Sequence, residues 1–297
     1  MSIIAVKHPD WLKLKAPSPI VLRKMKELLD DLSLHTVCEE ANCPNQGVCF
    51  ANGTATFLIM GDTCTRNCTF CAIKKGTPSF LDRREPLNVA RAVAILNLRH
   101  VVITSVTRDD LPDGGAEHFA ETVKIVRQHN PGVTIEVLIP DFQGLPEAIK
   151  TIVDSRPEVI NHNVETVPSL YCKVRPGADY TRSLDLLETA KLLDNKIVTK
   201  SGIMLGLGEN SQEIIATMRD LRNAQCDILT IGQYLPPSKL HHPLVEYVTP
   251  SQFQKYQSIG KEIGFGSVAS GPFVRSSFNA ASLYATVIEN RGKPIWR

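Results

Sequence analysis

The sequence predicts an α/β fold, a partial (β/α)6 barrel of the TIM type with a cysteine-containing N-terminal extension and a C-terminal extension. Two observations support this expectation. From about residue 55 onward, six short runs of apolar and β-branched residues alternate with amphipathic stretches. Polar or glycine-rich segments follow nearly every run, as they do at the C-terminal face of a barrel, where active sites collect. A doubly wound sheet shares the alternation, but these strand ends favour a barrel that is open at one side.

The elements are expected in a regular order. The first is an amphipathic helix over 18–34, with Ser18 as its cap, and the cysteine-rich segment follows it. Strands are then expected at 54–60, 100–106, 133–140, 158–164, 196–205 and 228–235. Helices are expected at 88–98, 116–128, 145–154, 181–193, 211–224 and 249–263, the last one capped by Thr249. We divide the chain into an N-terminal extension (1–52), the barrel (53–265) and a C-terminal extension (266–297).

Composition narrows the class of protein. The 297 residues include 43% hydrophobic and 22% charged ones, which is typical of a globular chain. The formal net charge of +2 gives no indication of a nucleic-acid or membrane partner, and we expect neither. No secretory signal is visible at the start, and no run of about 18 apolar residues occurs that could span a bilayer. We therefore expect a cytoplasmic protein.

Six of the eight cysteines fall between positions 38 and 71. Thiols stay reduced in the cytosol, so this clustering indicates metal binding or catalysis and not a disulfide framework. The two remaining cysteines, Cys172 and Cys226, are expected to be buried as small hydrophobic residues.

The most specific motif is CTRNCTFC, which places Cys64, Cys68 and Cys71 in the form C-x3-C-x2-C directly after the first expected strand. Soft thiolates select zinc, copper(I) or iron–sulfur clusters. Structural zinc closes all four of its positions, whereas this loop offers three ligands and no obvious fourth. A [4Fe–4S] cluster normally takes one cysteine per iron, so three thiolates leave one iron open to a substrate.

This motif, after the first strand of a βα-repeat, resembles that of the radical S-adenosylmethionine enzymes. The resemblance implies that the open iron binds S-adenosylmethionine, which is cleaved to methionine and a 5′-deoxyadenosyl radical that abstracts hydrogen from carbon. It places Phe70 beside the adenine. The usual Gly-Gly-Glu is absent from ITSVTRDD (103–110), where Thr107 is an alternative contact. The expected cofactor-binding residues are Phe70, Ser105, Val106, Asn163, Glu165, Arg175, Gly206 and Gly208.

Each of these residues also has a plainer explanation. Ser105 would then only end a strand, Glu165 and Arg175 would form surface ion pairs, and the two glycines would serve a turn. In the functional interpretation, the planar guanidinium of Arg175 pairs with the methionyl carboxylate.

A second cysteine motif lies upstream, where CEEANCPNQGVC holds Cys38, Cys43 and Cys49 in the form C-x4-C-x5-C. Together with HPDWLK near the N-terminus and GPFVRSSFNA near the C-terminus, it resembles the lipoyl synthase family over essentially the whole chain. The resemblance implies two [4Fe–4S] clusters, a radical cluster on Cys64, Cys68 and Cys71 and an auxiliary cluster on the upstream triad. It also implies that a serine of the Arg-Ser-Ser-aromatic motif is the fourth auxiliary ligand, and we choose Ser277, with Ser276 the alternative.

The implied reaction inserts sulfur at C6 and C8 of a protein-bound octanoyl-lysine to give the lipoyl group, with the auxiliary cluster as the sulfur donor. The implied partners are an octanoylated lipoyl carrier domain, from a 2-oxoacid dehydrogenase E2 or the glycine cleavage H protein, and reduced ferredoxin or flavodoxin as electron donor. Two other functions are open: another radical sulfur inserter akin to biotin synthase, and a non-enzymatic zinc- or iron-binding regulator. About eight irons per chain would favour the first function, about four a simpler radical enzyme, and zinc without sulfide the regulator.

Overall fold

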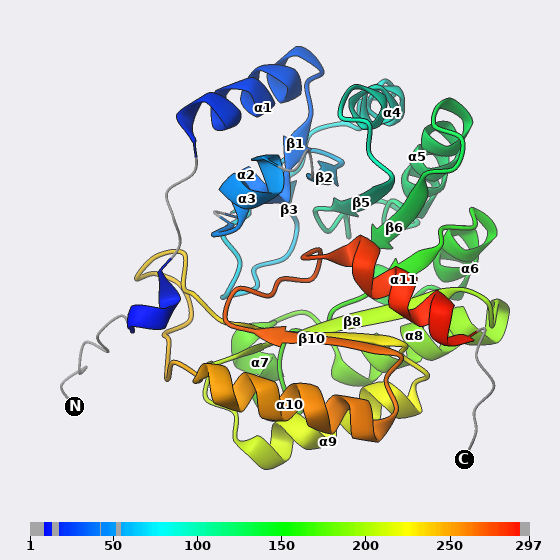
Figure 1. Cartoon of the computed structure of the whole chain (residues 1–297). Helices are drawn as coiled ribbons and strands as arrows, with labels where there is room; N and C mark the ends of the chain where they lie inside the picture. The colour runs from blue at the N-terminus through cyan, green and yellow to red at the C-terminus, as the bar shows by residue number, and fades with distance from the viewer. Residues whose placement is uncertain (1–8, 14–17, 42, 52–54, 292–297) are drawn as a thin grey trace.

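The computed structural model describes residues 9–13, 18–41, 43–51 and 55–291 (Figure 1). In this part of the chain, eight strands form one sheet in the order β1-β2-β5-β6-β7-β8-β9-β10. Every neighbouring pair from β2 to β10 is parallel, and the short β1 joins β2 antiparallel. The strands are β1 His35–Thr36, β2 Thr56–Ile59, β5 His100–Ser105, β6 Thr134–Leu138, β7 Val159–Asn161, β8 Val198–Leu205, β9 Ile228–Gln233 and β10 Ser267–Gly271.

Helices follow the parallel strands and cover the outer face of the curved sheet (Figure 1). These are α4 Glu85–Ile95, α5 Ala116–His129, α6 Pro146–Asp154, α8 Tyr180–Leu193, α9 Ser211–Asn223 and α10 Pro250–Ile263. Before the barrel come η1 Asp10–Leu12, α1 Pro19–Asp31, α2 Val37–Glu40 and α3 Gln46–Ala51. Shorter pieces are η2 Phe142–Gly144, η3 Pro168–Leu170 and α7 Tyr171–Val174, and the chain ends on α11 Ala280–Arg291.

The six expected strands are confirmed as β2 and β5 to β9, and the sheet contains one more parallel strand. This strand, β10, pairs with β9 from Ser267↔Ile228 to Gly271↔Gly232. Its sequence, SVASG, consists mostly of small residues and lacks the apolar run that marks the others. The sheet therefore continues into the segment that we assigned to the C-terminal extension.

Four expectations about single residues have mixed outcomes. Thr249 caps α10, because its side chain accepts from the Gln252 amide. Ser18 precedes α1, but among the described residues its side chain makes no capping hydrogen bond, so that expectation was wrong. Cys226 is buried as expected, whereas Cys172 is exposed, because it lies on the outer side of the short α7.

Helix α11 packs at the N-terminal ends of the strands, where it lies across the space between β5 and β10 (Figure 1). Its Leu283 and Val287 pack against the first residues of three strands, Val159, Val198 and Ile228. At the end of the helix, Arg291 donates to the Lys196 and Ile197 carbonyls and to Asp227. The C-terminal helix thus packs directly against the barrel at the start of its strands.

The barrel interior contains a buried charged group. Glu136 on β6 accepts from Lys200 on β8 at 2.8 Å and lies 3.3 Å from the His100 Nε2 atom, and both Glu136 and Lys200 are fully buried. Burial by itself would raise the pKa of Glu136, but the Lys200 ammonium and His100 lower it from 4.5 to about 2. The carboxylate is therefore ionised over the whole physiological range.

This depressed pKa predicts how stability depends on pH. A carboxyl group with a lowered folded-state pKa stabilises the fold fully above its unfolded pKa, and that contribution is lost as the pH falls toward 2. We expect Glu136→Gln to lower the free energy of unfolding by roughly 3 kcal/mol at pH 7, and by about half of that or less at pH 3. Urea unfolding of the metal-free chain at several pH values measures the difference. Glu188→Gln, on the exposed side of α8, is the matched control. If the loss in free energy of unfolding caused by Glu136→Gln did not become smaller as the pH falls from 7 to 3, that result would contradict the ionised pair.

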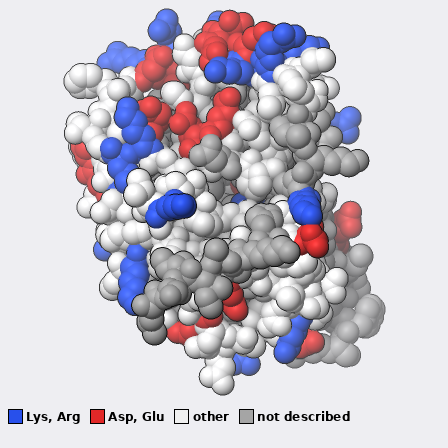
Figure 2. Space-filling view, turned by 90° about the vertical axis from the view of Figure 1, so that its left-hand side faces the viewer, with Lys and Arg blue, Asp and Glu red and all other residues white. Residues whose placement is uncertain are grey.

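No helix in the described ranges is both long and apolar enough to cross a membrane. On the face that Figure 2 displays, basic and acidic side chains are interspersed among uncharged ones and are not separated by sign. That distribution agrees with the small net charge of the whole sequence.

Candidate active site

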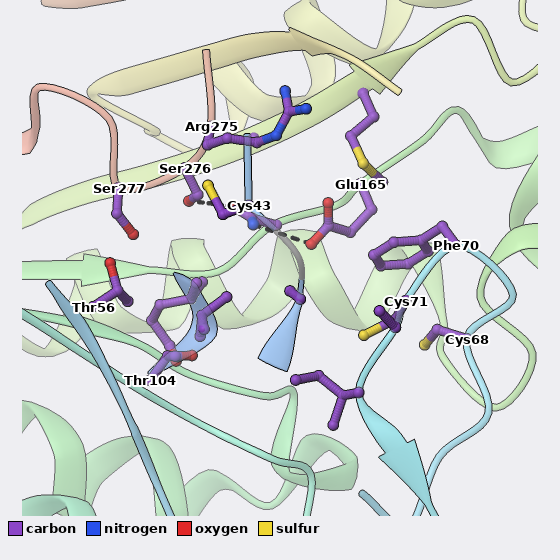
Figure 3. A pocket seen from close by; sticks show the side chains of 18 of the residues that line it. Cys43, Thr56, Cys68, Phe70, Cys71, Thr104, Glu165, Arg275, Ser276 and Ser277 are labelled. Atoms are coloured by element: carbon purple, nitrogen blue, oxygen red, sulfur yellow. Dashed lines mark hydrogen bonds between the residues drawn. The ribbon is translucent and has the colours of Figure 1, made fainter. Parts of the chain in front are cut away.

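A cavity of about 550 Å³ lies at the C-terminal ends of the parallel strands. All six clustered cysteines line it, and each is a free thiol. In Figure 3, Cys68, Cys71 and Phe70 lie on one side of this cavity, while Cys43 and Ser277 lie across from them. The structure therefore brings the two cysteine motifs, which are separate in the sequence, to one cavity.

The loop that holds Cys64, Cys68 and Cys71 is fastened at several points. Its base is a small parallel ladder between β3 (Thr63–Cys64) and β4 (Lys74–Lys75). The Thr65 amide donates to the Thr107 carbonyl after β5, and the Thr69 amide donates to the Val174 carbonyl on α7. Because a loop of this length needs outside contacts to keep its shape, these bonds place the three thiols relative to the barrel.

Arg66, inside the motif, makes the strongest of these contacts. Its guanidinium binds Asp109 through two hydrogen bonds of 2.7 and 2.9 Å, and it binds Asp141 at 2.6 Å. The Arg66 side chain is 8% exposed and that of Asp141 is 0% exposed. Burial works against the charge on Arg66, yet the two carboxylates raise its pKa further above its usual range. Arg66 thus fastens the cysteine loop to the segments that follow β5 and β6, a role that the motif alone did not reveal.

Removal of this contact should harm both folding and metal loading. Arg66→Met leaves the buried Asp141 carboxylate with a hydrogen bond from the Gln143 amide and a 3.4 Å contact to Arg182, and we expect a loss of about 3 kcal/mol in the free energy of unfolding. We also expect less iron per chain, because the loop loses its anchor. Urea unfolding and iron analysis measure the two effects. Arg83→Met, in the exposed segment before α4, is the control, and wild-type stability and iron content in Arg66→Met would refute the role.

The thiols have the chemistry of cluster ligands. Burial raises the pKa of Cys38 and that of Cys71 to about 12, and it also raises the pKa of Cys68. Such buried thiols are neutral without a metal and lose their protons when one binds. The Cys64 Sγ atom accepts from the Arg66 and Thr107 amides at 3.4 and 3.3 Å, and such bonds tune a cluster's reduction potential.

Several expected cofactor-binding residues line the same cavity: Phe70, Ser105, Val106, Asn163, Glu165 and Arg175. Among the described residues, the buried Ser105 Oγ and Arg175 Nε atoms have no hydrogen-bond partner. Such unpaired buried polar atoms are uncommon in folded proteins, and a bound polar ligand would satisfy them. The side chains present therefore fit S-adenosylmethionine.

Glu165 and Arg175 are not surface ion pairs. Arg175 donates to the Asn163 carbonyl and to the Tyr171 hydroxyl, each at 2.9 Å. Glu165 has a left-handed backbone with φ of 65°, which is unusual for a side-chain-bearing residue, and burial raises the pKa of its carboxyl. Figure 3 shows this carboxyl between Phe70 and Ser276.

The two predicted glycines are not part of the cavity lining. Gly206 and Gly208 have φ values of 100° and 117° and form a turn closed by Glu209, which accepts from the Gly206 amide. Their plainer explanation, a turn, thus agrees with the structure. The glycine of this stretch that lines the cavity is Gly202, where an added Cβ would lie 2.9 Å from the Asn163 Oδ1 atom. Gly202 was not among the predicted site residues, because nothing distinguishes it inside strand β8.

The upstream cysteines are joined to the C-terminal segment. Cys38 lies on α2 and Cys49 on α3, with Cys43 between these helices. Asn45, which is 4% exposed, donates to the Phe273 carbonyl at 2.7 Å across a sequence separation of 228 residues. Both Ser276 and Ser277 line the cavity beside this triad. Asn45 was not among the predicted site residues, although it stands inside the cysteine motif.

Within the ranges that the structure covers, no three His, Cys, Asp or Glu side chains gather around a point that could hold one metal ion. The six thiols instead surround one larger space. A [4Fe–4S] cluster spreads its ligands over four irons, so the donor set of three thiols per site fits a cluster.

Comparison with known proteins agrees with this geometry. The sequence profile of the Radical SAM superfamily matches residues 58–221, and the profile of the N-terminal domain of lipoyl synthase of the Radical SAM family matches residues 4–43. The lipoyl synthase of Caldanaerobacter subterraneus subsp. tengcongensis is 59% identical over 277 residues, which cover 93% of this chain and 97% of that protein. The lipoyl synthase of Coxiella burnetii (strain Dugway 5J108-111) is 51% identical over 276 residues, covering 93% and 88%.

Solved structures show the same fold. The crystal structure of methylornithine synthase aligns with a TM-score of 0.54 at 14% identity and covers 91% of this chain and 94% of that one. HydG, a maturase of the [FeFe]-hydrogenase, aligns with a TM-score of 0.55 at 14% identity, covering 87% and 69%.

The chain therefore belongs to the radical SAM enzymes, whose [4Fe–4S] cluster and S-adenosylmethionine the cavity fits. Within that superfamily it belongs to the lipoyl synthase family, on the evidence of its relatives over nearly the whole chain. Lipoyl biosynthesis by radical SAM chemistry implies an octanoylated carrier protein as the substrate.

Proposed function

We propose that this enzyme inserts sulfur at C6 and C8 of an octanoyl-lysine on a lipoyl carrier domain, with an auxiliary [4Fe–4S] cluster as the sulfur source. The observation that supports the proposal is the shared cavity, which both cysteine triads and Ser277 line. Substrate carbon and donated sulfur must meet, and one shared cavity provides the place. When bound, the cluster on Cys64, Cys68 and Cys71 supplies the electron that cleaves S-adenosylmethionine to the radical that takes hydrogen from the substrate carbon.

The side chains divide this work by position. Phe70, Ser105, Val106, Asn163, Glu165 and Arg175 hold S-adenosylmethionine beside the radical site. Arg175 is suited to the methionyl carboxylate, because its Nε–H is buried and unpaired among the described residues. The apolar parts of Leu58, Ile73, Ile139 and Val274, which also line the cavity, provide a water-poor path for the octanoyl chain.

The auxiliary site is proposed on Cys38, Cys43, Cys49 and Ser277. Among the described residues, the Ser277 hydroxyl has no hydrogen-bond partner, so its oxygen is available to an iron. An oxygen ligand is harder than thiolate and holds a sulfide-bridged iron less firmly. The site would therefore have one weak corner at which the cluster opens when its sulfur is given away.

The carrier is proposed to be a 2-oxoacid dehydrogenase E2 domain or the glycine cleavage H protein, with reduced ferredoxin or flavodoxin as electron donor. The reconstituted enzyme, incubated with an octanoylated carrier peptide, S-adenosylmethionine and a chemical reductant, should add two sulfurs to the peptide, which mass spectrometry detects. Cleavage of S-adenosylmethionine without any sulfur in the peptide would contradict the proposal.

A further inference from the structure

The Ser276 hydroxyl both accepts and donates a hydrogen bond. Its Oγ accepts from the Asn161 Nδ2 group at 2.7 Å and donates to the Asn163 Oδ1 atom at 2.9 Å. A serine hydroxyl has a single proton, and here that proton is given to Asn163. If the Ser276 oxygen bound iron as an alkoxide, it would lose the proton and face the Asn163 oxygen without a hydrogen between them.

Carboxyl oxygens at both ends set the direction of this chain of hydrogen bonds. The Asn161 Nδ2 group also donates to Glu136 at 3.0 Å, and the Asn163 Nδ2 group donates to Glu165 at 3.0 Å. An ionised carboxylate only accepts hydrogen bonds, so Asn161 must turn its NH₂ group toward Glu136. That same NH₂ group then reaches Ser276.

In this arrangement, the buried Glu136–Lys200 ion pair orients the side-chain amide of Asn161. A buried ion pair is weak evidence for stability, since apolar residues of similar volume are often as good or better. Here the pair keeps Glu136 ionised and held at 2.8 Å from Lys200, so the amide of Asn161 has one orientation. Through Ser276, the polar side chains of the barrel interior are thereby connected to the Arg-Ser-Ser stretch of the C-terminal segment.

The hydroxyl of the next residue, Ser277, is not held by hydrogen bonds to the described residues. Ser277 lines the cavity next to Ser276, and its hydroxyl makes no hydrogen bond to any residue that the structure describes. Figure 3 shows the two hydroxyls pointing in different directions. Because adjacent residues share a backbone, hydrogen bonds that hold the Ser276 side chain also restrain the backbone position from which the Ser277 hydroxyl projects.

We propose that Ser276 is a positioning residue, which ties the C-terminal segment to Asn161 and Asn163 inside the barrel and so holds the Ser277 hydroxyl beside Cys38, Cys43 and Cys49. This role rests on the proposed function only for what Ser277 binds, because the tie itself is a property of the protein chain. Asn163 contributes to the cofactor side of the cavity, so the tie also joins the two halves of the site.

Hydrogen exchange tests the tie without reference to activity. In the reconstituted enzyme, Ser276→Ala should speed exchange of the Val274 and Phe278 amides by about tenfold, because two hydrogen bonds that hold this segment are lost. Ser276→Thr, which keeps the hydroxyl, should restore the wild-type rate. Ser282→Ala, on the exposed face of α11, is the matched control and should have no effect. Wild-type exchange in Ser276→Ala would overturn the proposal.

Mössbauer spectra of the same proteins separate positioning from ligation. Ser277→Ala should abolish the signal of an oxygen-bound iron, whereas Ser276→Ala should only reduce it and Ser276→Thr should recover it. The opposite pattern, loss in Ser276→Ala and retention in Ser277→Ala, would make Ser276 the ligand and end the proposal. If the wild type holds about four irons instead of about eight, the second cluster of the proposed function fails, while the exchange rates still decide the tie.

Discussion

Cys38→Ala should leave S-adenosylmethionine cleavage intact and abolish sulfur insertion. Cys38 lies on α2 with the auxiliary triad, whereas Cys64, Cys68 and Cys71 are held by a separate loop at the other side of the cavity. The loss of one auxiliary thiol therefore spares the radical site. Cys64→Ala, in contrast, should abolish both cleavage and insertion, because a radical cluster needs all three of its thiols.

Two products measured in one reaction distinguish these variants. Methionine reports cleavage, and the mass of the carrier peptide reports sulfur. Iron content should fall from about eight to about four per chain in Cys38→Ala. Cys172→Ala, which changes an exposed thiol outside the cavity lining, is the matched control. Lipoyl product from Cys38→Ala would show that the upstream triad does not hold the donated sulfur.

Gly232→Ala should have the second largest effect, although it changes no candidate ligand. A Cβ at this position, the next-to-last residue of β9, would lie 2.1 Å from the Val274 carbonyl oxygen, which is backbone and cannot rotate away. The C-terminal segment must then move off the strand, together with Ser276 and Ser277. A displacement of about 1 Å at a site of this kind costs on the order of a hundredfold in rate, so we expect sulfur insertion to fall by that factor.

Its partner across the sheet provides the control. Gly271 on β10 is in register with Gly232, yet a Cβ on Gly271 would meet only the Val274 Cγ2 atom, at an ordinary 3.5 Å. Gly271→Ala should therefore turn over at close to the wild-type rate. Equal rates for the two variants would mean that the close approach at Gly232 does not position the segment.

Much of the barrel could be predicted because its elements have local signals. Period-two and period-3.6 apolar patterns identify a strand or helix from its own residues, which is why β2 and β5 to β9 were found. β10 was missed because SVASG lacks such a pattern, and only its pairing with β9 makes it a strand. Helix α11 likewise acquires its role from contacts with strands far away in the sequence.

The residues of the candidate site also divide into those with a local signal in the sequence and those without one. The spacing of each cysteine triad lies within a dozen residues and was visible at once. Arg66, Asn45 and Gly232 were not, because their partners are 43, 228 and about 40 residues away and nothing local marks the contact. Gly206 and Gly208 lie in a turn, and their contact with the cofactor stays a prediction, because a glycine needed for a turn and one needed beside a ligand look alike in a sequence.

The hydrogen bond between Asn45 and Phe273 has a consequence for how the enzyme is made. Its two residues are separated by 228 positions, and a ribosome adds roughly 5 to 20 residues per second, so the two ends of the proposed auxiliary site are synthesised roughly 10 to 50 seconds apart. The loop with Cys64, Cys68 and Cys71 meets its partners after β5, β6 and α7 much sooner. The contacts that hold the loop with Cys64, Cys68 and Cys71 are therefore complete in sequence before residue 273 is added, whereas the hydrogen bond of Asn45 can form only after it.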